Sequence, residues 1–222
     1  MYNTLYTMIF LKHILDALFP RSCIGCDKNG RTICEKCIER APKARDTENS
    51  FLSVFDYRDG VIKKALWMLK YKNRRDVAED LGRTMADHFA EDLIELAQMK
   101  NFVNPVLIPI PLSKKKLRKR GYNQSLLIAK SVAKNLQNFN LEIIENVLIK
   151  TKDTPPQAKI KNRRERLENL KDCFAISNKE KIVGRNIILV DDITTTGATL
   201  REATKVLKNA HAKKIISITA AH

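Results

Sequence analysis

The order of hydrophobic and polar positions along the chain predicts strands that alternate with helices. Ile187–Val190 and Val106–Pro111 are almost unbroken apolar runs, which is typical of strands buried on both faces in a parallel sheet. Phe51–Arg58 alternates apolar and polar residues, as a strand does. Two further strands are predicted within Leu141–Lys150 and Lys214–Ala221. The segments between these strands are long enough to hold helices.

Those segments carry apolar residues at helical spacing. In the first, Val61, Ala65, Leu66 and Leu69 share one face, and we expect Trp67 beside this stripe to pack rather than to serve as a platform for bases. The predicted helices span Val61–Tyr71, residues 76–97, Asn123–Leu136 and Ala198–Leu207. Strands that alternate with helices predict an α/β fold, a parallel sheet flanked by helices.

The strand at Ile187–Val190 leads into a loop whose residue types suit a phosphorylated sugar. In an open α/β sheet, ligands bind where the strands end. Ionised Asp191 and Asp192 would accept hydrogen bonds from sugar hydroxyls or hold hydrated Mg²⁺. The unpaired amides at the start of the next helix suit a phosphate. The loop residues that would hold this phosphate are Thr195, Thr196, Gly197, Ala198 and Thr199.

The stretch from Ile187 to Thr199 resembles the 5-phosphoribosyl-1-diphosphate (PRPP) motif of type I phosphoribosyltransferases. The match consists of an apolar strand, two acids and a Thr-Thr-Gly-x-Thr loop. This resemblance implies that the loop binds the 5-phosphate of PRPP and that the two aspartates hold the ribose diol. It also implies that Mg²⁺ accompanies the diphosphate. The purely structural alternative is a buried strand followed by a capped helix with surface acids.

Four cysteines near the start of the chain form two Cys-x-x-Cys pairs separated by seven residues. Each pair can place two thiolates on one ion, so together they predict a tetrahedral Zn²⁺ site. Two disulfides are the alternative, which a reducing compartment disfavours. A structural role and a role in contacting nucleic acid both stay open for this module. The predicted ligands are Cys23, Cys26, Cys34 and Cys37.

The chain has 222 residues and a formal net charge of +16. Such an excess favours polyanionic partners such as nucleic acid, or phosphate-rich ligands; liberal use of surface lysine is the alternative. A basic turn begins at Lys70, and it either binds the diphosphate or complements the end of its helix. No apolar run reaches the length of a membrane span.

The densest basic run follows the strand at Val106–Pro111. We expect a mobile loop there that closes over a diphosphate. Tracking a nucleic-acid backbone, with Tyr122 stacking on a base, is a second interpretation, and a solvated surface loop is a third. The residues of this loop and of the helix start behind it are Lys114, Lys115, Lys116, Arg118, Lys119, Arg120, Tyr122, Asn123 and Gln124.

Taken in order, the motifs resemble the ComF (ComFC) family of phosphoribosyltransferase-like competence proteins. The shared features are the four cysteines, Lys70-Tyr71, the strand at Ile108–Leu112, Arg120–Ser125 and the Asp-Asp-Thr-Thr-Gly loop. Tyr122 stands where the family carries Phe. Gln157, Arg166, Asn169 and Phe174 also fit the family's pattern. The resemblance implies a role in handling incoming DNA, beside a helicase-like translocase.

We therefore expect a zinc-ribbon-like module at residues 1–45 and a type I phosphoribosyltransferase-like domain at residues 46–222. Met8–Phe19 is interrupted by charged residues and lacks a small-residue cleavage site, so it predicts an amphipathic helix rather than a signal peptide. We expect a cytoplasmic protein.

The favoured function is a PRPP-binding protein of DNA uptake and natural transformation that also binds single-stranded DNA. The alternative is an active phosphoribosyltransferase of nucleotide or salvage metabolism with no nucleic-acid role. The motifs argue for binding and identify no nucleophile, so they do not decide whether ribose phosphate is transferred.

Overall fold

A five-stranded parallel sheet forms the centre of the computed structural model, which describes residues 21–45, 51–153 and 172–222. The strand order is β1-β7-β6-β2-β3, and every neighbouring pair is parallel. The strands are β1 (Phe51–Phe55), β2 (Val106–Pro109), β3 (Glu142–Ile143), β6 (Ile187–Ile193) and β7 (Ile215–Ala221). The predicted parallel sheet is confirmed.

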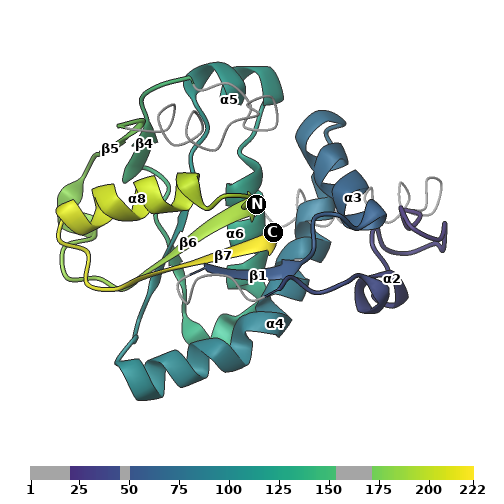
Figure 1. Cartoon of the computed structure of the whole chain (residues 1–222), viewed down its shortest axis with the longest axis horizontal. Coiled ribbons are helices and arrows are strands. Elements are labelled where there is room, and N and C mark those ends of the chain that lie inside the picture. The colour runs from purple at the N-terminus through teal and green to yellow at the C-terminus, as the bar shows by residue number, and fades with distance from the viewer. Residues whose placement is uncertain (1–20, 46–50, 154–171) are drawn as a thin grey trace, which may run out of the picture.

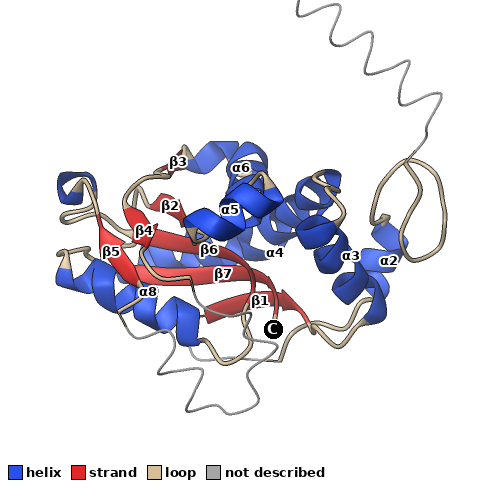
Figure 2. Ribbon diagram, turned by 90° about the horizontal axis from the view of Figure 1, so that it is seen from above, coloured by secondary structure: helices blue, strands red, loops and turns tan. Residues whose placement is uncertain are grey.

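Helices cover both faces of this sheet (Figures 1 and 2). On one face, α4 (Asp76–Lys100) and α6 (Gln124–Asn135) pack on each other and on the strands, and α3 (Gly60–Tyr71) packs on α4. On the other face lie α8 (Ala198–Asn209) and an antiparallel pair, β4 (Leu148–Lys150) with β5 (Phe174–Ile176). The four helices predicted within the described residues are confirmed. Short 3-10 turns occur at Gln137–Phe139 and Lys179–Lys181.

The unbroken apolar run of β6 reflects burial on both faces. Ile188 and Val190 belong to the core beneath α3, α4 and α6, whereas Ile187 and Leu189 belong to the core beneath α8. Successive side chains of a strand point to opposite faces, so a strand between two helical layers needs an apolar residue at every position. β6 also runs further than predicted, because Asp191 and Asp192 are its own residues rather than the first of the loop.

The prediction of a loop at the basic run was wrong, because residues Lys114–Arg120 form a helix, α5. Ser113 caps its first turn by accepting from the backbone N–H of Lys116 (3.3 Å). Gly121, with φ 79°, ends it in the left-handed conformation that glycine favours. Mutual repulsion of the cations is therefore outweighed by good capping at both ends.

The segment of residues 21–45 contains the cysteines and the short helix α2 (Glu35–Arg40), and it packs on the main sheet and helices. Ile33 and Ala41 are buried in the core of α3 and α4. The backbone N–H of Ile33 donates to the Asp80 carboxylate of α4 (3.0 Å), and Ala44 donates to the Val54 carbonyl (3.0 Å). The module thus shares its core with the domain behind it; the boundary at residue 45 stays a prediction.

Several predictions fall on residues that the structure leaves undescribed. The helix expected at Met8–Phe19 is one. The very basic stretch Ala158–Leu170, with Arg163 and Arg164, is another; its sequence predicts a helix that either adds to a positive surface or is a solvated face. Gln157, Arg166 and Asn169 also lie outside the described residues. Within the described ranges, no helix combines the length and the apolar character that a bilayer crossing requires.

Candidate functional site

A cavity of about 330 Å³ opens where β2 and β6 end and α3 and α5 approach them. Small-molecule sites in proteins occupy about 300–1,000 Å³, so this cavity is large enough for one small ligand. Carboxylates, hydroxyls, cations and aromatic rings line it together. The polar and aromatic residues of its wall are Tyr57, Trp67, Lys70, Tyr71, Lys116, Arg120, Gln124, Lys150, Asp191, Asp192, Thr194, Thr195 and Thr199.

Asp191 and Asp192 sit in this wall as buried carboxylates, and each has partners within the chain. Asp192 forms an ion pair with Lys70 and accepts from the Gln124 side-chain amide (3.2 Å). Asp191 accepts from the Ser125 hydroxyl (2.8 Å) and from the backbone N–H of Asp192 (2.9 Å). Burial lowers the pKa of Lys70, but the Asp192 carboxylate outweighs burial and leaves it raised. Lys70 therefore stays charged beside this carboxylate.

Burial raises the pKa of the Asp191 carboxyl to about 7, and the neighbouring Asp192 carboxylate contributes to the rise. The Ser125 hydroxyl and the Lys70 ammonium act in the opposite direction and are outweighed. Two adjacent carboxylates in a poorly solvated wall repel each other, so one of them takes up a proton more readily. Asp191 is therefore the carboxyl of this pair that takes up a proton near neutral pH.

This shift predicts a pH-dependent stability. The pKa of Asp191 in the folded state, about 7, exceeds the ordinary value of 3.8. The carboxyl therefore contributes stability below its unfolded pKa, and this contribution is lost as the pH rises through the folded pKa. Asp191→Asn stays uncharged and can still accept from Ser125. Between these two pKa values, the unfolding free energy of the variant should rise relative to that of the native chain as the pH increases. The gain should be up to about 1.4 kcal/mol per pH unit.

Urea unfolding of the two chains at pH 5 and pH 8 checks this prediction. Titrating groups that do not interact with Asp191 cancel in the difference between the chains. A difference that is the same at both pH values contradicts a raised Asp191 pKa.

The threonine loop lies at the start of α8. Gly197 has φ 70°, and a Cβ there would come within 2.8 Å of the Arg201 guanidinium and of the Phe51 ring, so only glycine fits. Thr195, Gly197, Ala198 and Thr199 line the cavity. Thr196 does not: its hydroxyl oxygen is buried and has no hydrogen-bond partner among the described residues. The loop thus presents amides and two of the three expected hydroxyls to the cavity.

Helix α5 divides the expected basic residues between two faces. Lys116 and Arg120, four residues apart, line the cavity. Arg120 donates to the Gln124 side chain. The pKa of Lys116 is lowered, mainly by burial and to a smaller extent by the nearby Lys150 ammonium. The other cations of α5 are exposed and do not line the cavity; these outer cations are Lys114, Lys115, Arg118 and Lys119.

Two residues expected in the binding loop have structural contacts instead. The Tyr122 ring is only 7% exposed, its hydroxyl donates to the Leu69 carbonyl, and the Arg75 guanidinium covers its ring at 4.6 Å. The expected stacking of Tyr122 on a base is therefore contradicted. Asn123 caps α6 by accepting from the Ser125 N–H (3.1 Å) and donates to the Ile110 carbonyl (3.0 Å).

The sequence analysis missed some residues of the site. Ser125 ends the motif Arg120–Ser125 but was not assigned to the site; it does not line the cavity itself, and it donates to Asp191, which does. Lys150 is an isolated lysine at the end of β4, with no local signal. Trp67 and Tyr71 were expected to pack or to mark a turn, and they are 47% and 60% exposed. Contacts between distant segments bring Lys150, Trp67 and Tyr71 to the cavity and Ser125 to Asp191.

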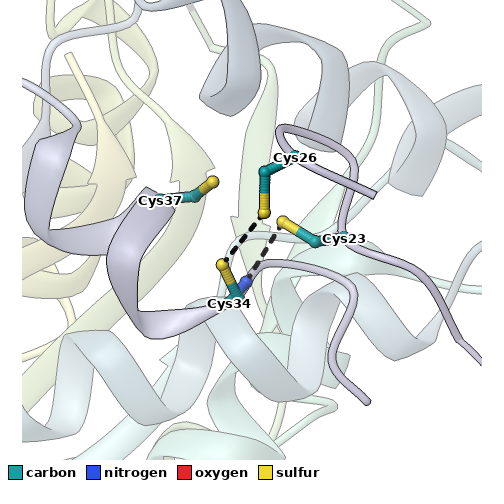
Figure 3. Close-up of side chains that lie close together, drawn as sticks. All are labelled: Cys23, Cys26, Cys34 and Cys37. Atoms are coloured by element: carbon teal, nitrogen blue, oxygen red, sulfur yellow. Dashed lines mark hydrogen bonds between the residues drawn. The ribbon is translucent and has the colours of Figure 1, made fainter. Parts of the chain in front are cut away.

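The four predicted metal ligands come together (Figure 3). They lie near Val61, at the N-terminal end of α3 and away from the cavity. The sulfurs of Cys23, Cys26, Cys34 and Cys37 all lie within 4.8 Å of one another. A tetrahedral ion with Zn–S bonds of about 2.3 Å places its sulfurs about 3.8 Å apart. Four thiols at this spacing can hold one metal ion such as zinc. The Cys26 and Cys34 sulfurs are 3.5 Å apart, and all four cysteines are free thiols.

Backbone N–H groups favour the thiolate at one of the four sulfurs, that of Cys23, whereas burial and the neighbouring thiols raise the pKa of Cys37 to about 12. The N–H groups of Gly25 and Cys34 both donate to the Cys23 sulfur at 3.4 Å. Burial raises the pKa of this thiol, but the N–H donors together outweigh burial and lower it to about 6. A Cβ at Gly25 would come within 2.9 Å of the Cys37 sulfur, so the knuckle requires glycine. Thiolate is the form that binds metal.

Comparisons with known proteins agree with this architecture. Residues 122–222 match the model of the phosphoribosyl transferase domain. Over 94% of this chain, competence protein ComFC of Bacillus subtilis is 30% identical, and the match covers 79% of that protein. DNA utilization protein YhgH of Escherichia coli K12 is 25% identical, over 78% of this chain and 70% of its own length.

A solved structure of Trypanosoma cruzi hypoxanthine phosphoribosyl transferase covers 64% of each chain, at 16% identity and a TM-score of 0.42. The domain match and the parallel sheet together confirm the predicted phosphoribosyltransferase-like fold with a cysteine cluster at its N-terminal side. With this fold, this cluster and this identity to ComFC along nearly its whole length, the chain belongs to the ComF family of competence proteins.

Proposed function

We propose that the cavity binds PRPP together with Mg²⁺, and that the chain acts in DNA uptake as a protein that also binds single-stranded DNA. One observation carries the first part: carboxylates, threonine-loop amides and cations line a single cavity. A sugar that carries a phosphate at one end and a diphosphate at the other needs these three kinds of group.

The 5-phosphate would lie on the loop before α8. Gly197, Ala198 and Thr199 begin a helix of 12 residues, whose first N–H groups and dipole favour an anion. Thr195, exposed at the rim, adds a hydroxyl. The positive φ of Gly197 lets the backbone approach the phosphate closely.

The ribose diol would lie against Asp191 and Asp192. Both carboxylates already have partners within the chain, so the ribose hydroxyls would join an existing network of hydrogen bonds and an ion pair. Lys70, released in part from Asp192, could then turn to the diphosphate.

The diphosphate would face Lys116, Arg120 and Lys150, which line the same cavity. Burial, and after it the nearby Lys150 ammonium, lowers the pKa of Lys116, so an anion between the two lysines relieves a repulsion. Mg²⁺ fits here because the wall offers carboxylate oxygen, the ligand that Mg²⁺ prefers. When bound, it neutralises diphosphate charge.

For the cysteine cluster we propose structural zinc, held by all four thiolates in the cytoplasm, where thiols stay reduced. The role in DNA uptake is supported by the relatives, which are named as competence and DNA utilization proteins. The outer cations of α5 supply a surface for phosphates of single-stranded DNA. A helicase-like translocase is a fitting partner in such a process.

The matched lysines of α5 test the PRPP site. Lys116 lines the cavity, whereas Lys115 is exposed on the outer side of the same helix. Lys116→Met should weaken PRPP binding about 10- to 100-fold, since hydrogen bonds to charged groups contribute roughly 1.5–3 kcal/mol. Lys115→Met should leave it unchanged. Isothermal titration with PRPP and Mg²⁺ measures both; equal affinities of the two variants contradict the assignment.

The same titration, repeated with single-stranded DNA and with acceptor bases, addresses the second candidate function. Acids beside a ribose and cations around its diphosphate suit the charge separation of phosphoribosyl transfer. Release of diphosphate on addition of an acceptor, with no affinity for DNA, would favour an active phosphoribosyltransferase of nucleotide metabolism. PRPP that stays intact while DNA binds favours the first function.

A further inference from the structure

Two aromatic rings stand exposed at the mouth of the cavity. Trp67 and Tyr71 lie four residues apart on α3, so they share one face of the helix. Their side chains are 47% and 60% exposed, and their ring centroids are 6.2 Å apart with the planes at 48°. Both rings belong to the cavity wall.

These rings do not hold the fold together. The residues by which α3 packs on the core are Ile62, Ala65, Leu66 and Leu69, which are at most 1% exposed. An exposed tryptophan beside an exposed tyrosine leaves a large apolar surface in water without a packing role. Such a surface on a folded domain marks a place where another molecule binds.

Cations flank both rings. Lys72 lies over the Trp67 ring with its nitrogen 5.3 Å from the centroid, and the Arg120 guanidinium lies 5.7 Å from the centroid of Tyr71. Arg120 is the last residue of α5, and the exposed cations of that helix precede it in the chain. Aromatic rings between cations are the pattern that binds single-stranded nucleic acid, with bases on the rings and phosphates on the cations.

We propose that Trp67 and Tyr71 form a stacking platform for unpaired bases of single-stranded DNA, with the phosphates on Lys72 and the outer face of α5. This inference rests on the proposed binding of single-stranded DNA and gives it a surface. At 47% and 60% exposure the rings reach out of the cavity into solvent, where bases of a passing strand can stack on them. A strand that passes the mouth would leave the deep part of the cavity to the sugar phosphate.

The fluorescence of Trp67 gives a direct test, because it is the only tryptophan of the chain. A thymidine oligomer should quench this fluorescence on binding. An abasic deoxyribose-phosphate oligomer of equal length and charge should bind about tenfold or more weakly and should not quench, because stacking contributes about 1–3 kcal/mol per base.

Variants of the two rings complete the test. Trp67→Ala with Tyr71→Ala should remove the preference for the thymidine oligomer over the abasic one, by the same factor at every salt concentration, and Trp67→Phe should retain it. The control Met99→Ala, a residue 77% exposed on α4, should keep the preference. Lys114→Ala with Lys119→Ala should instead make the slope of log K against log salt concentration less steep. The expected change is about 0.7 for each phosphate that the variant no longer neutralises.

Three outcomes would overturn the platform, and they are distinguishable. If the native chain binds neither oligomer, the proposed DNA binding is lost and the platform with it. If both oligomers bind equally well, DNA binding stands and only the platform is wrong. If a free nucleobase quenches Trp67 as effectively as the oligomer does, the rings serve a small acceptor instead.

Discussion

Cys34→Ser is expected to release the metal ion and to lower the thermal stability of the whole chain. Three thiolates hold zinc far less tightly than four, and structural zinc contributes about 10–16 kcal/mol in zinc-finger peptides. The loss reaches beyond residues 21–45 because Ile33, next to Cys34, lies in the core of α3 and α4 and is held by Asp80. Metal analysis and thermal unfolding measure the two effects.

Cys173→Ser is the matched control. Cys173 is also a buried free thiol, and it lies outside the cluster next to β5. Its replacement can cost some stability through burial of a hydroxyl, but the metal content should stay at one ion per chain. An unchanged metal content in the Cys34 variant, or a native chain that purifies without metal, would overturn the four-thiolate site.

Asp192→Asn is expected to reduce stability and PRPP affinity together. Its carboxylate is the counter-ion of Lys70, and their side chains are only 4% and 20% exposed. Removing one partner of a buried pair leaves an uncompensated charge, which costs about 3–5 kcal/mol of unfolding free energy. The ribose would also lose an acceptor. Urea unfolding and PRPP titration on the same preparation measure both quantities.

The double variant Lys70→Met with Asp192→Asn separates the two effects. Without the buried ammonium the unfolding free energy should recover most of its loss, since an apolar pair can replace a buried ion pair. PRPP affinity should stay low. Glu142→Gln, which removes an exposed pair with Arg185, should change stability little. Recovery of PRPP affinity in the double variant would show that Asp192 acts only through Lys70 and does not contact the ribose.

Much of the fold follows from local pattern. The strands at Ile187 and Val106 and the helix after Gly197 are encoded by periodicity within a few residues, and the structure confirms them. The cysteine pairs needed only their spacing, because two turns bring the ligands together. The prediction of a loop at Lys114–Arg120 was wrong because it gave the charge of the segment more weight than its helix caps, Ser113 and Gly121.

The sequence by itself determined how the main strands and helices alternate along the chain, where the threonine loop follows β6, and which four thiols form the cluster. Each of these depends on residues close together in the chain. Only the tertiary structure decided that Lys70 pairs with Asp192, that Ser125 holds Asp191, and that Trp67 faces solvent. Each of these depends on how α3 and α6 pack beside the end of β6. Packing between distant segments leaves no periodic trace in a single sequence, so the partners of a side chain are known only once the chain has folded.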